Sequence, residues 1–430
     1  MTISKSVVVN LISIFLSDFP DCFRQYLVSK LKWEKLGLVN GKIFVNSYFP
    51  PFPSRAFESV RKAWRCTMNG TTVPEIATIA ITNKCPYDCE YCSVPDKTVC
   101  DLPTGSLIQT IHSLQKMGTY HFSLTGGEPL LREDLIDIVN SVDSRSIVKL
   151  FSTGYSLTKK RAKALKEAGL FSINISLDNI DPQKHDAGCN YDGAFDIALN
   201  AIQYSKAASL LTCVATVVTK ERIRSGEIFR FLEFMRELDV DEVTIFEPIP
   251  TGKLAFCDNA ILGDNERGLL KLLHKDANGS QDNKYPRIFS FPYVESSEYM
   301  GCGAGCTRLH ITALGEVMPC DFTQVTFGNI QKEQIKTIWK RMNKTFEKPS
   351  SGCFALDNYK LLRESNHKAS DIMDSHHIYM NEEVVKKNEL PAFYDNLMNN
   401  EELIVSSVVE NTAKNTNPTD GADKFAASAR

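Results

Sequence analysis

The sequence predicts an α/β fold in which a parallel sheet curves into a six-stranded partial barrel. Between residues 74 and 250, short apolar runs alternate with longer stretches of helical periodicity, a pattern typical of βαβ units and a parallel sheet. Six such units are too few for a closed eight-stranded barrel. Several apolar runs end in glycines or short polar residues. Because parallel α/β folds bind ligands at the carboxyl ends of their strands, we expect the site at that rim.

The predicted strands are short runs of apolar, β-branched and aromatic residues. They are Glu75–Thr82, Tyr120–Leu124, Ile147–Ser152, Phe171–Leu177, Leu211–Val218 and Glu242–Phe246. The predicted helices between them carry apolar residues at helical spacing. They are Ser106–Lys116, Glu133–Asn140, Lys159–Ala168, Tyr191–Ser205 and Ser225–Leu238.

The chain of 430 residues is long enough for two or three domains. The N-terminal region begins with an apolar segment, Val7–Leu16, whose narrow polar stripe predicts a helix docked on the barrel or on a partner. A proline-stiffened linker, Tyr48–Ser54, is expected to run along the barrel. The predicted divisions are an N-terminal region at 1–71, the barrel at 72–255, a linker and small cysteine-bearing domain at 256–355, C-terminal helices at 356–410 that break near Pro391, and a disordered tail at 411–430.

Three cysteines follow the first predicted strand within eight residues. Cys85, Cys89 and Cys92 lie in ITNKCPYDCEYCS, with the spacing C-x3-C-x2-C. Three thiolates so close together can hold an iron–sulfur cluster. Because a 4Fe–4S cluster takes four ligands, one iron would stay open for a small molecule. A zinc site is the alternative, since C-x2-C pairs are common zinc ligands.

A glycine turn follows the second predicted strand. The segment HFSLTGGEPLL places Gly126, Gly127, Glu128 and Pro129 directly after Tyr120–Leu124. Glycines let the backbone approach a ligand closely, and the Glu128 carboxylate can accept hydrogen bonds from an amine. Taken alone, the same four residues would form a turn with a helix-leading proline.

Together, the C-x3-C-x2-C loop and the GGEP turn resemble those of the radical S-adenosylmethionine (SAM) superfamily. The resemblance spans residues 74–355 and implies the same partial barrel. It implies that Cys85, Cys89 and Cys92 bind a 4Fe–4S cluster whose open iron holds SAM, and that reduction cleaves SAM to a 5′-deoxyadenosyl radical. It also implies that the GGEP turn grips the SAM amino group and that Tyr91 lies beside the adenine.

Short polar residues end the next two strands. Ser152 ends the third, and Ser176 and Asp178 end the fourth. By the resemblance, these side chains would hydrogen-bond the SAM ribose or carboxylate. The alternative is that they form strand-end turns.

One departure from the family pattern follows the fourth strand. Many relatives read H-D-x-x-R-G there, whereas Cys189 stands at the arginine position in this chain. A thiol cannot make the two hydrogen bonds that a guanidinium makes to a carboxylate. Either Arg132 or Lys220 serves instead, or the SAM carboxylate is held differently.

A second group of cysteines lies in the C-terminal third. The pieces LHIT and EVMPC, joined by Ala-Leu-Gly, predict a β-hairpin, and a helix is expected at Lys332–Met342. This region resembles the twitch or SPASM type of auxiliary-cluster extension, and it lacks the further cysteine run of a full SPASM extension. The resemblance implies one auxiliary 4Fe–4S cluster. The alternatives are zinc and a smaller ligand set that leaves an iron open for substrate. The expected ligands are Cys302, Cys306, Cys320 and Cys353.

Composition excludes several classes of protein. A net charge of −3 without a long basic run argues against a nucleic-acid binder. Thirteen cysteines clustered at metal spacing do not resemble a secreted disulfide framework and indicate the cytoplasm. Membrane association is not expected, because the apolar N-terminal helix lacks a basic polar face.

The expected function is that of a radical SAM enzyme, an oxidoreductase that activates a C–H bond. The resemblance implies a peptide, cofactor precursor or other small molecule as substrate, and a reductase such as flavodoxin or ferredoxin as partner. The auxiliary cluster would aid oxidation or anchor the substrate. Three alternatives stay open: a radical SAM methyl- or methylthio-transferase, a lipid-modifying enzyme, and a non-catalytic zinc-binding scaffold.

Overall fold

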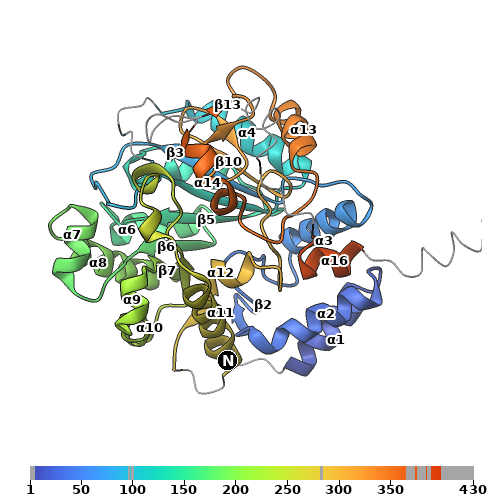
Figure 1. Ribbon diagram of the computed structural model, residues 1–430, viewed down its shortest axis with the longest axis horizontal. Coiled ribbons are helices and arrows are strands. Elements are labelled where there is room, and N and C mark those ends of the chain that lie inside the picture. The colour runs from blue at the N-terminus through green and yellow to red at the C-terminus, as the bar shows by residue number, and fades with distance from the viewer. Residues whose placement is uncertain are drawn as a thin grey trace, which may run out of the picture.

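A nine-stranded sheet forms the centre of the molecule in the computed structural model (Figure 1). The structure describes residues 5–94, 97, 101–280, 284–364, 373–374, 384 and 389–398. Within these residues the strand order is β11-β10-β3-β4-β5-β6-β7-β8-β9. The predicted tail at 411–430 and part of the predicted C-terminal helices lie outside the described residues.

All six predicted strands are confirmed, and they are parallel neighbours in chain order. They are β3 (Ile76–Thr82), β4 (His121–Gly126), β5 (Ile147–Ser152), β6 (Ser172–Ser176), β7 (Leu211–Val217) and β8 (Glu242–Phe246). The five predicted helices are also present, with ends shifted by a few residues. They are α4 (Thr104–Met117), α5 (Leu135–Asn140), α6 (Lys159–Glu167), α8 (Ala194–Ala207) and α10 (Glu227–Glu237).

Three strands extend this sheet beyond the six predicted ones. At one side, β9 (Arg287–Ser290) pairs in parallel with β8. At the other side, β10 (Arg308–Ile311) pairs in parallel with β3 and antiparallel with β11 (Val317–Met318). The expected hairpin therefore exists, and both of its strands belong to the central sheet. The sheet thus crosses the division that the sequence suggests at residue 255.

Short elements complete the chain between and after these strands. Two short helices that were not predicted, α7 (Pro182–Cys189) and α9 (Lys220–Arg224), precede α8 and α10. The expected helix after the hairpin is α13 (Ile335–Thr345). The others are η2 (Pro129–Leu131), η3 (Gly252–Leu254), η4 (Asp258–Ala260), α11 (Asp264–Gly279), α12 (Phe291–Val294), β12 (Val325–Thr326), α14 (Phe354–Glu364), β13 (Met373–Asp374) and α16 (Ala392–Met398).

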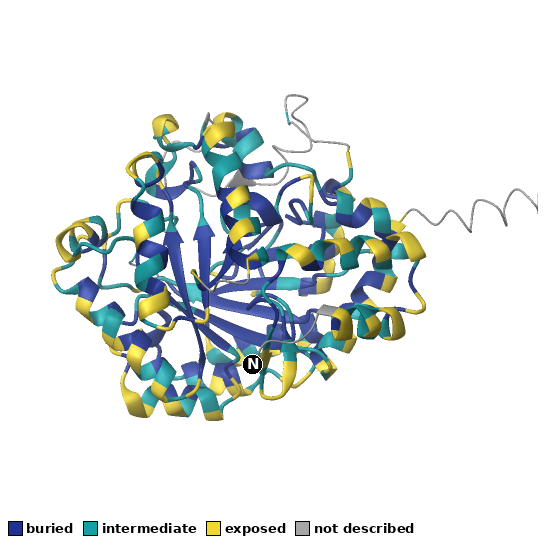
Figure 2. Cartoon of the chain, turned by 90° about the horizontal axis from the view of Figure 1, so that it is seen from below, coloured by how far each residue is buried: buried dark blue, intermediate teal, exposed yellow. Residues whose placement is uncertain are grey.

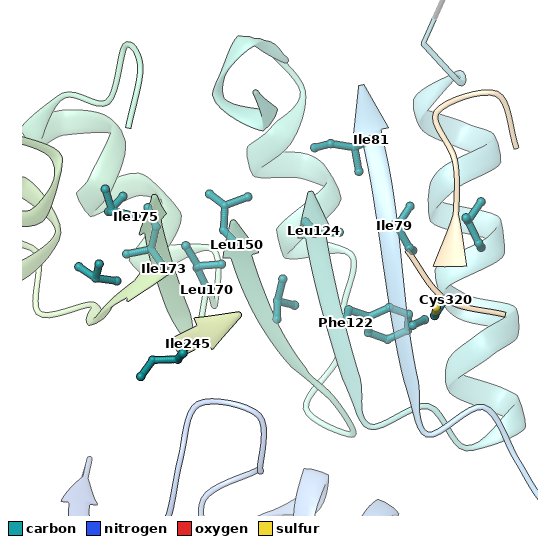
Figure 3. Packing of buried hydrophobic residues seen from close by; sticks show 14 of the residues in the cluster. Ile79, Ile81, Phe122, Leu124, Leu150, Leu170, Ile173, Ile175, Ile245 and Cys320 are labelled. Carbon is teal, nitrogen blue, oxygen red and sulfur yellow. The ribbon is translucent and has the colours of Figure 1, made fainter. Parts of the chain in front are cut away.

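The main hydrophobic core lies between the sheet and the helices that cover it (Figure 2). Alternate strand residues point into this core, including Ile79 and Ile81 of β3, Phe122 and Leu124 of β4, and Leu150 of β5 (Figure 3). Side chains in a strand alternate between the two faces of the sheet. The residues between these positions therefore face the inside of the curved sheet.

The inside of the sheet is polar and is closed at the amino ends of the strands by the N-terminal linker. The side chain of Lys149 is fully buried, and its Nζ donates a hydrogen bond to Ser47 Oγ at 2.5 Å. Ser47 in turn donates its backbone N–H to Glu242 Oε2 at 2.8 Å. The Tyr48 carbonyl lies 3.0 Å from His121 Nδ1. Since one short segment touches β4, β5 and β8 together, the sheet must curve around it. The linker, which the sequence predicts to run along the barrel, begins inside it at the amino ends of the strands.

The N-terminal helix docks on this chain itself. Helix α1 (Lys5–Phe15) buries Val8 against Leu31 and Leu36. Beyond its end, Leu16 joins an aromatic cluster that contains Trp64 and Phe393, whose ring centroids lie 5.3 Å apart. The remaining elements of this region are α2 (Asp21–Lys30), η1 (Leu31–Trp33), β1 (Gly37–Val39), β2 (Lys42–Phe44) and α3 (Arg55–Met68).

Helix α16, which holds the last described residues, packs against α2 and α3 of the N-terminal region (Figure 1). Among the residues that the structure describes, no helix has the length and apolar character needed to cross a membrane.

The buried pair of Lys149 and Glu242 is expected to matter for stability. Lys149 Nζ lies 4.0 Å from Glu242 Oε1, and neither side chain is exposed. Glu242→Gln should lower the free energy of unfolding by about 3–5 kcal/mol, because it leaves a buried ammonium without a countercharge. Urea denaturation measures this. The matched control is Glu167→Gln, since Glu167 pairs with Lys163 at 3.7 Å on the surface; its effect should stay below about 1 kcal/mol. Equal effects of the two variants would contradict the assignment.

Candidate active site

The cysteine loop begins at the carboxyl end of β3. Cys85, Cys89 and Cys92 are free thiols and partly exposed. Burial raises the pKa of Cys85 to about 11. Lys97 Nζ donates a hydrogen bond to Cys92 Sγ at 3.2 Å, which places a positive charge beside a sulfur that would carry negative charge as an iron ligand.

The GGEP turn interlocks with the start of this loop. Gly127 donates its N–H to the Thr82 carbonyl at 2.7 Å, and Glu128 donates its N–H to the Lys84 carbonyl at 2.7 Å. Gly126 has φ +143°, and a Cβ there would collide with the Thr82 carbonyl. A Cβ at Gly127 would likewise strike the Lys84 carbonyl. Both glycines are therefore required by the close approach of two backbones.

The carboxylate of Glu128 is fully buried and accepts four hydrogen bonds from the protein. Oε1 accepts from Leu130 N at 2.8 Å and from Ser152 Oγ at 2.7 Å. Oε2 accepts from Thr153 N at 2.7 Å and from Thr153 Oγ1 at 2.6 Å. Burial raises the pKa of this carboxyl group. A carboxylate has about four acceptor positions, so an amine would have to replace one of these donors.

The other predicted rim residues take different places. Ser152 also accepts the Gly154 N–H at 2.9 Å, so its hydroxyl holds the turn after β5. Pro129 is buried at the start of η2. Ser176 ends β6 and stays partly exposed.

Tyr91 and Asp178, predicted separately, are brought together. The Tyr91 hydroxyl donates a short hydrogen bond to Asp178 Oδ2. Asp178 Oδ1 accepts from Val217 N at 2.7 Å and from Thr216 Oγ1 at 3.2 Å. Burial raises the pKa of Tyr91, and the neighbouring carboxylate adds to the effect. This network ties the cysteine loop to the carboxyl ends of β6 and β7.

The helix that carries Cys189 docks on the same loop. The backbone N–H of Asp88 donates to the Cys189 carbonyl at 3.0 Å, and that of Glu90 donates to the Gly188 carbonyl at 3.1 Å. Asp186, the acidic residue of the H-D pair, accepts the N–H groups of Gly193 and Phe195 at 2.7 and 2.8 Å. It therefore fixes the start of α8.

The two cations suggested in place of the arginine already have protein partners. Arg132 donates to the carbonyls of Ile81 and Leu102 at 2.7 and 3.0 Å and pairs with Asp134. Lys220 Nζ donates to the Asn259 carbonyl at 2.8 Å.

A segment after β8, which the sequence reasoning missed, also covers the cysteine loop. Lys253 donates its backbone N–H to the Cys92 carbonyl at 3.0 Å. Gly252 has φ +54°, and a Cβ there would collide with the Cys92 carbonyl. The run PIPTG at residues 248–252 was the available signal, because proline and glycine at a strand end mark a tight turn.

The second cysteine group gathers where β10 and β11 join the sheet. Cys302, Cys306 and Cys320 are buried and Cys353 is partly exposed. The side chains of Cys302 and Cys353 lie within hydrogen-bond reach of each other. Burial raises the pKa of Cys306 and of Cys320 to about 12. Cys320 packs in the same cluster as Ile79 and Phe122 (Figure 3), so this group lies against the barrel.

Two charged pairs beside these cysteines were not predicted. Arg308 NH1 lies 2.6 Å from Glu295 Oε1. His310 Nδ1 lies 2.9 Å from Asp321 Oδ1. Burial raises the pKa of Asp321, but its neighbours His310 and Arg308 outweigh burial and hold that pKa below its usual value. Arg308 and His310 belong to β10, and the pairing of β10 with β3 is what places them at the barrel.

The donor sets at both places consist of thiols, which are the protein ligands of iron–sulfur clusters. The cysteine loop and the glycine turn lie so close together that a Cβ at Gly126 or Gly127 would strike the Thr82 or Lys84 carbonyl. Within the part of the chain that the structure describes, no three His, Cys, Asp or Glu side chains are arranged to hold a single metal ion.

Comparison with protein families gives two matches. Residues 79–243 match the radical SAM superfamily, and residues 302–365 match SPASM, an iron–sulfur cluster-binding domain. The first span begins within β3 and ends within β8, and the second holds all four cysteines of the second group.

Three relatives illustrate the range of similar proteins. A GTP 3′,8-cyclase of Limosilactobacillus fermentum is 30% identical over 56% of this chain and 77% of its own length. A PqqA peptide cyclase of Methylocella silvestris is 25% identical over 60% of this chain and 72% of its own. An AdoMet-dependent heme synthase of Methanosarcina barkeri is 25% identical over 63% and 83%.

Two solved structures share the fold. Streptococcus suis SuiB, bound to its precursor peptide SuiA, has a TM-score of 0.56 and 15% identity, over 74% of this chain and 78% of SuiB. The protein anSMEcpe, with bound AdoMet and a peptide, has a TM-score of 0.51 and 18% identity, over 78% of this chain and 99% of that one. The chain belongs to the radical SAM superfamily and carries a SPASM domain. Its cofactors are therefore a 4Fe–4S cluster, SAM and auxiliary iron–sulfur clusters.

Proposed function

We propose that this chain is an oxidoreductase that activates a C–H bond of a peptide or a cofactor precursor. The observation that carries the proposal is the interlock of the cysteine loop with the GGEP turn through Thr82 and Lys84. When bound, the cluster and SAM would supply a 5′-deoxyadenosyl radical that takes a hydrogen atom from the substrate.

The residues have distinct roles in this proposal. Cys85, Cys89 and Cys92 would hold the first cluster, and the two glycines would let SAM approach the backbone. The second cysteine group would hold the auxiliary cluster.

The relatives support two substrate classes. The PqqA cyclase acts on a peptide, as its name says, and SuiB binds its precursor peptide. The GTP cyclase, by its name, acts on a nucleotide. We propose a cytoplasmic enzyme with a flavodoxin or ferredoxin as electron donor. The products of SAM separate this proposal from a methyltransferase, since C–H activation yields 5′-deoxyadenosine and methyl transfer yields S-adenosylhomocysteine.

Iron content tests the two clusters. Anaerobically reconstituted protein should carry about eight irons if both sites hold 4Fe–4S clusters. The triple variant Cys85→Ala, Cys89→Ala, Cys92→Ala should keep about half. Iron and sulfide analysis measures this, and near-zero iron with stoichiometric zinc would instead support the zinc scaffold.

Glu128 tests the SAM site. Glu128→Ala should weaken SAM binding by about 10- to 150-fold, because a charge-assisted hydrogen bond contributes about 1.5–3 kcal/mol. The first cluster should remain, since no iron ligand is lost. Glu133→Ala, an exposed position in the same segment, is the control, and calorimetry with SAM is the measurement. Unchanged affinity together with lower stability would show that Glu128 only supports Ser152 and Thr153.

The third experiment separates the two cysteine groups. A Cys320→Ala, Cys353→Ala variant should lose about half of the iron. It should still form 5′-deoxyadenosine under dithionite, because the loop with Cys85, Cys89 and Cys92 follows β3 and keeps all of its cysteines. Turnover of the substrate that the wild-type enzyme uses should stop, because the order of a hairpin around a metal depends on the metal ligands that this variant lacks. Chromatography of the SAM products measures the first effect. Loss of SAM cleavage with an intact first cluster would contradict the separation, and continued turnover would make the second site dispensable.

A further inference from the structure

Helix α7 brings two buried side chains against the cysteine loop. Cys189 is 4% exposed and His185 is 2% exposed. The Cys189 side chain is buried in a cluster against which Cys89 packs, within hydrogen-bond reach of it, and Cys189 Sγ lies 3.7 Å from His185 Nε2. The backbone hydrogen bonds from Asp88 and Glu90 to the end of α7 hold the two segments in this position.

The direction of these contacts follows from a backbone amide. The N–H of Asp178 donates to His185 Nδ1 at 3.2 Å. A backbone N–H can only donate, so Nδ1 carries no proton and the proton of the neutral ring lies on Nε2. Burial lowers the pKa of His185, which keeps the ring neutral. Nε2–H therefore points its proton at Cys189 Sγ.

Cys189 is thus an acceptor toward His185, and its own S–H is free to donate. The sulfur next to it is that of Cys89. We propose that Cys189 is a positioning residue that donates a hydrogen bond to the Cys89 sulfur and raises the reduction potential of the cluster that Cys89 would hold. This inference rests on the proposed function, because it requires an iron–sulfur cluster at Cys85, Cys89 and Cys92.

The effect on the potential follows from electrostatics. Reduction adds negative charge to the cluster and its sulfur ligands. A donor aimed at one of those sulfurs stabilises the reduced form more than the oxidised form. The contact is largely removed from water, so solvent screens it little. At this position the chain presents a neutral donor beside the cluster ligand itself.

The experiment is a redox titration of anaerobically reconstituted full-length protein, followed by electron paramagnetic resonance. The signal to follow is the one that changes when SAM is added, since this reports the first cluster. In Cys189→Ala, the ratio of reduced to oxidised cluster at a fixed potential should fall by up to about tenfold, equivalent to a midpoint about 59 mV lower. Cys189→Ser keeps a donor and should restore part of the shift. Cys213→Ala removes another buried thiol, on β7, and should leave the midpoint unchanged.

The outcomes are separable. An unchanged midpoint in Cys189→Ala, with full iron content, overturns the inference and leaves the proposed function intact. Loss of half of the iron in that variant also overturns it, because Cys189 would then be needed to hold the cluster. An equal shift in Cys213→Ala overturns it as well, since any buried thiol would then have the effect. A wild-type protein without a SAM-responsive signal overturns the proposed function itself.

Discussion

The close approach of two backbones at the end of β3 and β4 is the constraint on which the site depends. The carbonyls of Thr82 and Lys84 accept the N–H groups of Gly127 and Glu128, and no side chain fits between the segments. This contact fixes where the cysteine loop leaves the sheet. It also fixes the Glu128 carboxylate, which in turn holds Ser152 and Thr153 at the end of β5. The rim is therefore a chain of hydrogen bonds that runs from strand to strand.

Local signals were enough for much of the fold. The six strands were predicted from their apolar runs, and the cysteine loop and GGEP turn were placed at the rim because they follow such runs directly. The hairpin at β10 and β11 was predicted from its turn. The strand β9 was missed because four residues, RIFS at 287–290, carry too short a pattern to separate from a loop.

The rest depends on contacts between distant parts of the chain. Nothing near residue 308 indicates that β10 pairs with β3, so Arg308 and His310 could not be assigned to the barrel. The approach of Cys189 to Cys89 spans a hundred residues and depends on where α7 docks. Glu128 shows the limit in another way. The motif predicted an acidic residue there, but three of its four protein donors come from Ser152 and Thr153 at the end of another strand, which only the folded chain brings near.

The pairing of β10 with β3 also bears on how the protein folds. The paired residues, 76–79 and 308–311, lie more than half the chain apart. Until the C-terminal third has been synthesised, β3 has an open edge with unpaired backbone groups. Contacts between residues so far apart in the sequence form slowly, because closing a long loop costs conformational entropy before the paired strands contribute any stabilising contact. The strand that leads into the cysteine loop is thus completed late, and a nascent or truncated chain would present that edge to other strands.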